Sequence, residues 1–184
     1  MSEPAFKYDV AFSFLDKDLN LALEISRKLS DNIASFVYSE RQAELAGKEG
    51  EETINRVYGE EARIVLVLYR NGWGESTWTR IEKTAIQNRS LVQGYDFTIF
   101  VLLDDKPTPP PWLPKTRLWF NYPKFGIDGI TATLENRVQE TGGNATPLTL
   151  EERTARTEAS LAALRRRTEY LKSEASVIQA TNEF

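Results

Sequence analysis

The strongest constraint on the fold is an alternation of short apolar runs with amphipathic stretches. Five runs predict strands, over Tyr8–Phe14, Ala34–Tyr38, Ala62–Tyr69, Phe97–Leu103 and, more weakly, Arg117–Phe120. Helical spacing follows most of them, over Asp18–Asp31, Gly50–Gly59, Thr77–Asn88 and Ile127–Gln139. Ala62–Tyr69 is apolar at nearly every position, as expected of a strand with both faces covered. The pattern predicts an α/β domain with a five-stranded parallel, flavodoxin-like sheet and helices on both faces.

Topology indicates where a ligand would bind. In the common strand order 2-1-3-4-5, the order reverses between the first and third strands, and ligands bind beyond the carboxyl ends of the strands at that point. The loops Leu15–Asp18 and Arg70–Thr77 meet there, and the polar loop Ser39–Lys48 can fold over the same crevice. The beginning of the Thr77–Asn88 helix is therefore the predicted site.

Two absences in the composition narrow the chemistry, because the chain has no His and no Cys. They exclude Ser-His-Asp and Cys-His nucleophiles, thiol redox chemistry, zinc sites and disulfides. Catalysis would have to use carboxylates, hydroxyls, Lys, Arg or backbone amides. With 23 Lys and Arg against 27 Asp and Glu, the net charge of −4 gives no support to nucleic-acid binding. No G-x-G-x-x-G or Walker A motif is present, which excludes Rossmann and P-loop sites.

Trp78 and Glu82 are the candidate functional pair at the predicted site. They are four residues apart, so they share one face of the Thr77–Asn88 helix. An indole beside a carboxylate could hold an aromatic, partly cationic ligand. A structural interpretation competes with this one: Thr79-Arg80-Ile81-Glu82 matches a capping box, and Trp78 could be a core anchor. From spacing alone, the structural interpretation is favoured.

Other acidic residues give weaker alternatives. Asp104 and Asp105 close the fourth strand, but adjacent side chains on a strand point to opposite faces, so a polar loop start is favoured over a shared ion. Asp9, Asp16 and Asp18 raise a phospho-receiver alternative. The third strand ends in Tyr69-Arg70, where a receiver would carry its phosphoacceptor aspartate, and this disfavours that alternative.

The C-terminal part of the chain is predicted to lie outside the α/β domain, which is assigned to residues 1–141. Residues 142–148 form a linker, and a capping box at Thr149 opens a helix over residues 149–184 whose heptad spacing is mediocre. Packing on its own domain and self-association are equally favoured for this helix. The N-terminus has no signal-peptide pattern, and the apolar runs are too short to span a bilayer, so a soluble cytoplasmic protein is expected.

Four ordered motifs resemble those of TIR (Toll/interleukin-1 receptor) domains. Tyr8–Phe14 resembles the family's opening box, and Ala62–Tyr69 followed by Trp78-x-x-x-Glu82 resembles its third strand and tryptophan–glutamate motif. Phe36-Val37-Tyr38 with the following loop is similar to the second strand and overhanging loop. Asp104-Asp105 with the proline-rich connector resembles the bacterial branch. The opening box departs from many members, because Leu15-Asp16-Lys17-Asp18 follows Phe14 in place of a small or basic residue and Gly-Glu-Asp.

For the enzymatic members, the resemblance implies cleavage of NAD at the nicotinamide–ribose bond. The products would be nicotinamide and ADP-ribose or a cyclic ADP-ribose isomer, often in bacterial anti-phage immune signalling. NAD would be a substrate, and neither a cofactor nor a metal is expected. Glu82 aligns with the catalytic glutamate and Trp78 with the aromatic residue that lines the site. The remaining implied substrate contacts are Phe14, Leu15, Asp16 and Ser39.

The resemblance also carries a non-catalytic alternative, a TIR–TIR interaction or adaptor module. The acid at Glu82 distinguishes the two, since many adaptors lack one there. The two functions can coincide, because the enzymatic members resemble filament formers in which the Ser39–Lys48 loop of one subunit completes its neighbour's site. The resemblance therefore implies homo-oligomers with other TIR domains as partners. No nucleic acid or membrane partner is expected.

Overall fold

A computed structural model describes residues 6–41 and 49–144, together with residues 151, 154 and 158. The chain divides into two compact units, Met1–Pro147 and Leu148–Phe184, and the sheet with its covering helices belongs to the first. Apart from the three separate residues, the predicted helix over 149–184 lies outside the described residues. Its role and the domain boundaries at 141 and 148 stay predictions. Within the described residues, no helix has the length and apolarity needed to cross a bilayer.

Within the described residues, four parallel strands form one sheet in the order β2-β1-β3-β4. They are β1 (Tyr8–Ser13), β2 (Ser35–Phe36), β3 (Ala62–Tyr69) and β4 (Thr98–Leu102). Ser13 at the end of β1 pairs with Val67 of β3, and Val65 pairs with Thr98 of β4. This order confirms the prediction for the first four strands. The strand order therefore reverses between β1 and β3.

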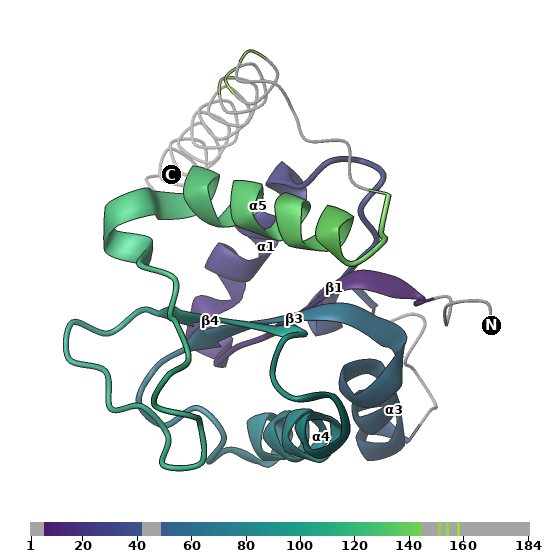
Figure 1. The fold of residues 1–184 in the computed structure, drawn as a ribbon, viewed down its shortest axis with the longest axis vertical. Coiled ribbons are helices and arrows are strands. Elements are labelled where there is room, and N and C mark those ends of the chain that lie inside the picture. The colour runs from purple at the N-terminus through teal and green to yellow at the C-terminus, as the bar shows by residue number, and fades with distance from the viewer. Residues whose placement is uncertain (1–5, 42–48, 145–150, 152–153, 155–157, 159–184) are drawn as a thin grey trace, which may run out of the picture. The chain divides into compact units, whose positions relative to one another are not determined.

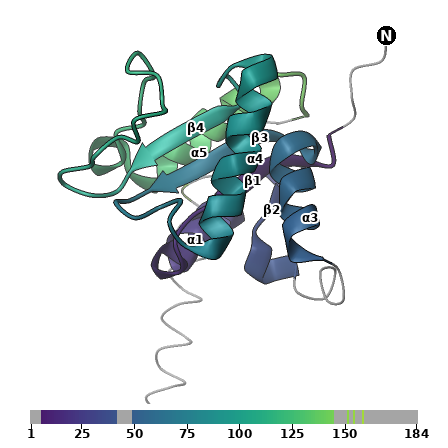
Figure 2. The ribbon, with the colours of Figure 1, turned by 90° about the horizontal axis from the view of Figure 1, so that it is seen from below.

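Helices cover both faces of the sheet (Figure 1, Figure 2). One face carries α1 (Leu19–Lys28) and α5 (Tyr122–Glu140), and the other carries α3 (Gly50–Arg56) and α4 (Thr77–Gln93). Alternate residues of β3 enter the two cores. Ile64 and Leu66 pack with α1 and α5, whereas Val65 and Val67 pack with α3 and α4, and all four are fully buried. Because both faces of β3 contact an apolar core, apolar and polar residues do not alternate along this strand.

The prediction of a fifth strand over Arg117–Phe120 is wrong, because these residues do not form a strand. The structure has a single parallel bridge there, between Val101 and Phe120, with the Phe120 N–H donating to the Phe100 carbonyl at 2.8 Å. Side chains occupy the rest of the edge: Arg117 donates to the carbonyl of Thr98, and Arg137 donates to that of Asp96 at 2.7 Å. Because guanidinium groups bond these carbonyls, a fifth strand gains little from pairing there.

A π-helical turn, η3 (Val57–Glu61), joins α3 to β3 and fixes Tyr58 beneath α4. Arg89 of α4 is buried and donates to the Ala62 carbonyl at 2.6 Å and to the Tyr58 carbonyl at 3.4 Å. Its guanidinium also lies 3.9 Å from the centre of the Phe97 ring. Burial lowers the pKa of Arg89 to about 10. Arg89 thus ties the end of η3 to α4, which holds the Tyr58 ring against the sheet.

Candidate active site

A pocket of about 290 Å³ lies at the carboxyl end of β1, beside the reversal of strand order. Its walls come from the end of β1 and the following loop, from η2 (Tyr38–Arg41), from α3 and from the beginning of α4. The lining residues are Phe12, Phe14, Leu15, Asp16, Leu19, Tyr38, Ser39, Ile54, Ser76, Trp78, Thr79 and Glu82. Among these described residues, two are carboxylates and none is Lys or Arg.

All of the site residues predicted from the sequence line this one pocket: Phe14, Leu15, Asp16, Ser39, Trp78 and Glu82. They come from three segments that are far apart in the chain, and the sheet brings them together. Their roles in binding or catalysis stay predictions.

Glu82 is buried, with 8% of its surface exposed, and two hydroxyl groups bond its carboxyl group. Ser13 Oγ donates to Oε2 at 2.6 Å, and the Tyr58 hydroxyl donates to Oε1 at 3.3 Å. The Tyr58 hydroxyl also lies 2.6 Å from the Phe12 carbonyl, and Trp73 Nε1 donates to Ser13 Oγ at 2.9 Å. The carboxyl group therefore sits in a preformed polar network inside an otherwise apolar core.

Burial raises the pKa of Glu82 from its ordinary value of 4.5 to about 8. The hydrogen bonds from Ser13 and Tyr58 oppose this rise in the pKa, and the negative charge of Asp16 adds to it. A carboxyl group that titrates near neutral pH at the edge of a pocket is typical of functional sites.

The capping-box interpretation of Thr79 and Glu82 is wrong. The N-cap of α4 is Ser76, whose Oγ accepts from the Thr79 N–H at 3.3 Å, so Thr79 is the third residue of the helix. Thr79 Oγ1 accepts from the Gly74 N–H at 3.0 Å and lies 2.7 Å from Ser76 Oγ. Glu82 consequently lies one turn further along α4, and its side chain bonds β1 and η3 instead of the helix terminus.

Trp78 lines the pocket and has 49% of its surface exposed, so the interpretation as a core anchor is also wrong. Its ring centre is 5.9 Å from that of Tyr38, at an interplanar angle of 32°. A Cβ on Gly50 would lie 2.9 Å from the indole, so Gly50 lets Trp78 approach the backbone of α3. Beside this aromatic pair, the buried Ser39 hydroxyl has no hydrogen-bond partner among the described residues.

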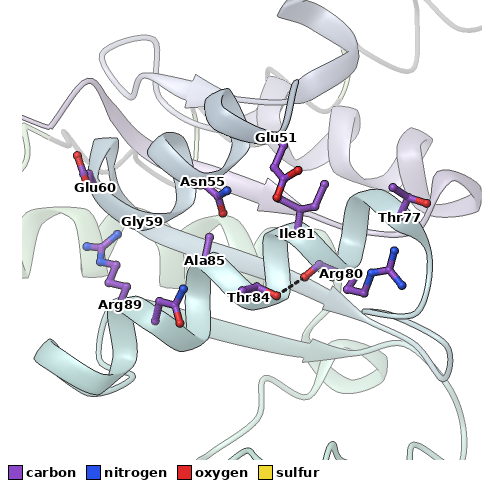
Figure 3. A pocket seen from close by; sticks show the side chains of 11 residues that line it. Glu51, Asn55, Gly59, Glu60, Thr77, Arg80, Ile81, Thr84, Ala85 and Arg89 are labelled. Carbon is purple, nitrogen blue, oxygen red and sulfur yellow. Dashed lines mark hydrogen bonds between the residues drawn. The ribbon is translucent and has the colours of Figure 1, made fainter. Parts of the chain in front are cut away.

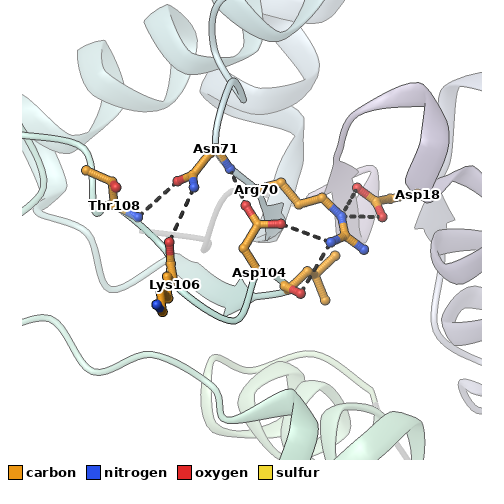
Figure 4. Close-up of polar contacts among 7 residues, drawn as sticks. Asp18, Arg70, Asn71, Asp104, Lys106 and Thr108 are labelled. Carbon is orange, nitrogen blue, oxygen red and sulfur yellow. Dashed lines mark hydrogen bonds and ion pairs between the residues drawn. The ribbon is translucent and has the colours of Figure 1, made fainter.

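Arg70 joins the loops at the carboxyl ends of three strands (Figure 4). Its Nε donates to both oxygens of Asp18, at 2.8 and 2.9 Å, and its Nη1 donates to Asp104 at 3.0 Å. The Asn71 N–H donates to Asp104 at 2.7 Å, and this bond, followed by the Arg70 bond, lowers the pKa of Asp104. Asp104 thus begins a structured loop, as expected. Asp18 is engaged by Arg70, and Asp9 by Arg63 at 3.3 Å, so these two acids belong to separate ion pairs and not to one receiver site.

A larger pocket, of about 630 Å³, lies between α3 and α4 and shares no lining residue with the Glu82 pocket (Figure 3). Glu51 and Asn55 face Arg80 and Thr84 across it. Its polar groups are dispersed over two helices, with no buried carboxyl group at its base, and within the described residues no cluster of acids could hold a metal ion. The smaller pocket is therefore the candidate active site.

The fold matches a solved structure. The TIR domain of the Toll-related receptor TRR-2 from Hydra magnipapillata superposes with a TM-score of 0.53 at 15% sequence identity, covering 72% of this chain and 99% of that one. The chain folds as a TIR domain.

Sequence comparison also finds a bacterial relative of this chain. The chain is 22% identical over 141 residues to a 3′ cyclic ADP-D-ribose synthase, AaTIR, from Aquimarina amphilecti. The match covers 76% of this chain and 42% of the relative, so the chain spans less than half of that protein. No family model matches the sequence.

Sequence reasoning missed three members of the Glu82 network: Ser13, Tyr58 and Trp73. Two of them carried a signal. Ser13 is a polar residue that ends an otherwise apolar strand, and Trp73 stands between two glycines. Gly72 and Gly74 have φ of 93° and 85°, and this tight turn directs the indole into the core. The role of Tyr58 depends on η3, which no local pattern predicts.

Proposed function

We propose that this TIR domain cleaves NAD at the nicotinamide–ribose bond, with Glu82 as the catalytic residue. The observation that carries the proposal is the buried Glu82 carboxyl group, held by Ser13 and Tyr58 at the edge of an aromatic pocket. The similarity to a bacterial 3′ cyclic ADP-D-ribose synthase supports this reaction class.

The chemistry needs only one acidic side chain. Nicotinamide is bound to the ribose as a cationic pyridinium and departs as a neutral molecule, so the leaving group requires no general acid. Bond cleavage passes through an oxocarbenium-like state at the ribose, as in glycoside hydrolysis. A buried carboxylate stabilises that positive charge more strongly than an exposed one, because little water screens it. A chain without His or Cys can therefore carry out this reaction with Glu82.

The pocket lining suits the nicotinamide–ribose end of NAD. Trp78 and Phe14 offer aromatic faces for a cationic ring, and Asp16 adds a second carboxylate. The Ser39 hydroxyl, without a partner among the described residues, is free to bond a ribose hydroxyl or the carboxamide. We assign Trp78, Phe14, Leu15, Asp16 and Ser39 to substrate binding on this basis.

The test is nicotinamide release from NAD by the purified protein, with products separated by mass spectrometry into ADP-ribose and its cyclic isomers. Glu82→Gln should lower kcat by at least about 100-fold, since it removes the charge that stabilises the transition state. Glu135→Gln is the matched control: Glu135 is also buried and accepts from a serine, Ser30, at 2.7 Å, but it belongs to α5 and does not line the Glu82 pocket. Equal turnover by wild type and Glu82→Gln would exclude Glu82 as the catalytic residue.

The same test decides the alternative function. A folded wild-type protein that leaves NAD intact would favour a non-catalytic TIR–TIR interaction module. A role in anti-phage immune signalling, taken from the family resemblance, is part of the proposal. Its test is whether Glu82→Gln removes phage protection from bacteria that express the protein.

A further inference from the structure

Ser13 contacts Glu82 from the side of the sheet and does not line the pocket. It is fully buried at the end of β1, and its hydroxyl lies 2.6 Å from Glu82 Oε2 and 2.9 Å from Trp73 Nε1. Neither Ser13 nor Trp73 is among the residues that line the pocket. Both can therefore act on a bound substrate only through Glu82.

The direction of the hydrogen bonds in this chain follows from donor and acceptor chemistry. An indole N–H can only donate, so the Ser13 hydroxyl accepts from Trp73. A serine hydroxyl has one proton, and with Trp73 on its acceptor side that proton points to Glu82 Oε2. Ser13 is therefore a fixed donor, and a fixed donor favours the ionised form of the carboxyl group.

Tyr58 is the weaker of the two donors to Glu82. Its single hydroxyl proton has a closer acceptor, the Phe12 carbonyl at 2.6 Å, than Glu82 Oε1 at 3.3 Å. Burial raises the pKa of Tyr58 well above 10, so Tyr58 stays neutral. The short bond from Ser13 is thus the main polar restraint on the carboxyl group.

Trp73 is held rigidly, which makes it a reliable anchor for Ser13. Only 5% of its surface is exposed, and its ring centre lies 6.0 Å from Tyr69, 6.3 Å from Trp112 and 6.4 Å from Phe100. Close packing on several sides leaves the indole a single orientation. The N–H therefore points at Ser13 before any substrate binds.

We propose that Ser13 and Trp73 are positioning residues for the reaction: Trp73 orients the Ser13 hydroxyl, and Ser13 holds Glu82 as an oriented carboxylate facing the substrate. This inference rests on the proposed NAD cleavage and deepens it. It separates residues that bind NAD from residues that prepare the catalytic group. It also links that group to the aromatic rings that pack around Trp73.

The titration of Glu82 provides the readout. The titratable groups that act on it are Tyr58 of η3, through a hydrogen bond, and Asp16 of the loop after β1, through its charge. Lys83, its neighbour on α4, is engaged with the Gly74 carbonyl at 3.1 Å. Removing the Ser13 donor leaves burial and Asp16 in place, so Glu82 should ionise at higher pH.

The experiment compares wild type, Ser13→Ala, Trp73→Phe and Ser13→Thr, with kcat and KM for NAD measured from pH 6 to 9.5. The titration of Glu82 is followed independently by NMR of carboxyl-labelled glutamate, with its signal assigned from Glu82→Gln. Ser30→Ala is the matched control, since Ser30 is also buried and donates to a buried glutamate, Glu135, at 2.7 Å.

In Ser13→Ala we expect the midpoint of both profiles to move up by about one pH unit, with kcat about tenfold lower at pH 7 and little change in KM. The deficit should shrink as the pH rises above 9, where the ionised form of Glu82 becomes the major form in both proteins. Trp73→Phe should raise the midpoint of both profiles by less than Ser13→Ala does. Ser13→Thr keeps a hydroxyl donor and should have the midpoint of wild type. Ser30→Ala should match wild type.

Two outcomes overturn the inference alone: a loss in Ser13→Ala that is equal at every pH, or an unchanged Glu82 titration by NMR. Wild type that leaves NAD intact overturns the proposed function and this inference together.

Discussion

Glu82 and Glu135 are both buried glutamates that accept a short hydrogen bond from a serine, on opposite faces of the sheet. The bond to Glu82 is 2.6 Å and the bond to Glu135 is 2.7 Å, so the local chemistry is alike. Their surroundings differ: Glu82 borders a pocket with aromatic walls, whereas Glu135 is a buried residue of α5 that does not line this pocket. Burial of a carboxyl group alone therefore does not mark a site, and the adjoining pocket distinguishes the two residues.

The raised pKa of Glu82 predicts a cost in stability at high pH. With a pKa of about 8 in the folded protein and 4.5 as the ordinary value, the folded state binds more protons than the unfolded state between those limits. The free energy of unfolding therefore falls as pH rises through this window, by roughly a few kcal/mol at most. Glu82→Gln removes the ionisable group and should raise Tm relative to wild type at pH 8.5. The difference should be small at pH 5. Thermal unfolding at both pH values checks this, and a Tm difference that does not grow with pH would contradict it.

At the scale of elements, the outer edge of β4 is held by side chains. Arg117 donates to the carbonyl of Thr98, a residue with 1% exposure. Arg117→Ala should leave that carbonyl without its donor and lower the free energy of unfolding by about 1–3 kcal/mol. Urea unfolding measures the change. Arg80→Ala, which truncates an exposed arginine at the beginning of α4, is the control and should cost little. Equal stability of the two variants would mean that Arg117 does not secure the edge.

A feature of the fold can be predicted from the sequence when contacts between residues close together in the chain determine it. The apolar runs predict β1, β3 and β4 because local burial determines them, and the strand order then predicts the position of the site. The predicted N-cap of α4 is wrong because two hydroxyl residues, Ser76 and Thr79, are both suitable caps, and the structure uses Ser76. The Ser13–Glu82 bond joins residues 69 positions apart, and no local pattern encodes such a contact. The prediction of a fifth strand is wrong because the side chains of Arg117 and Arg137 bond carbonyl groups along this edge of the sheet in place of a strand.

At the scale of the whole molecule, the open side of the pocket bears on self-association. Trp78 lines the pocket and has nearly half of its surface exposed, and Tyr38 and Ser39 line the same pocket. Oxocarbenium chemistry benefits from exclusion of water, and a second copy packed over this side would provide it. A head-to-tail contact of this kind produces filaments when the rotation between successive copies does not close into a ring.

We therefore expect NAD cleavage to depend on protein concentration. The specific activity of wild type should rise at least about fivefold between nanomolar and tens of micromolar protein, in parallel with the mass measured by light scattering, because only assembled sites exclude water. An excess of albumin in every dilution controls for adsorption to surfaces. Adding folded, inactive Glu82→Gln to dilute wild type should restore activity, since the variant keeps the surface that covers a neighbour's pocket. Constant specific activity over this range, with no gain from Glu82→Gln, would indicate that one copy of the domain forms the complete site.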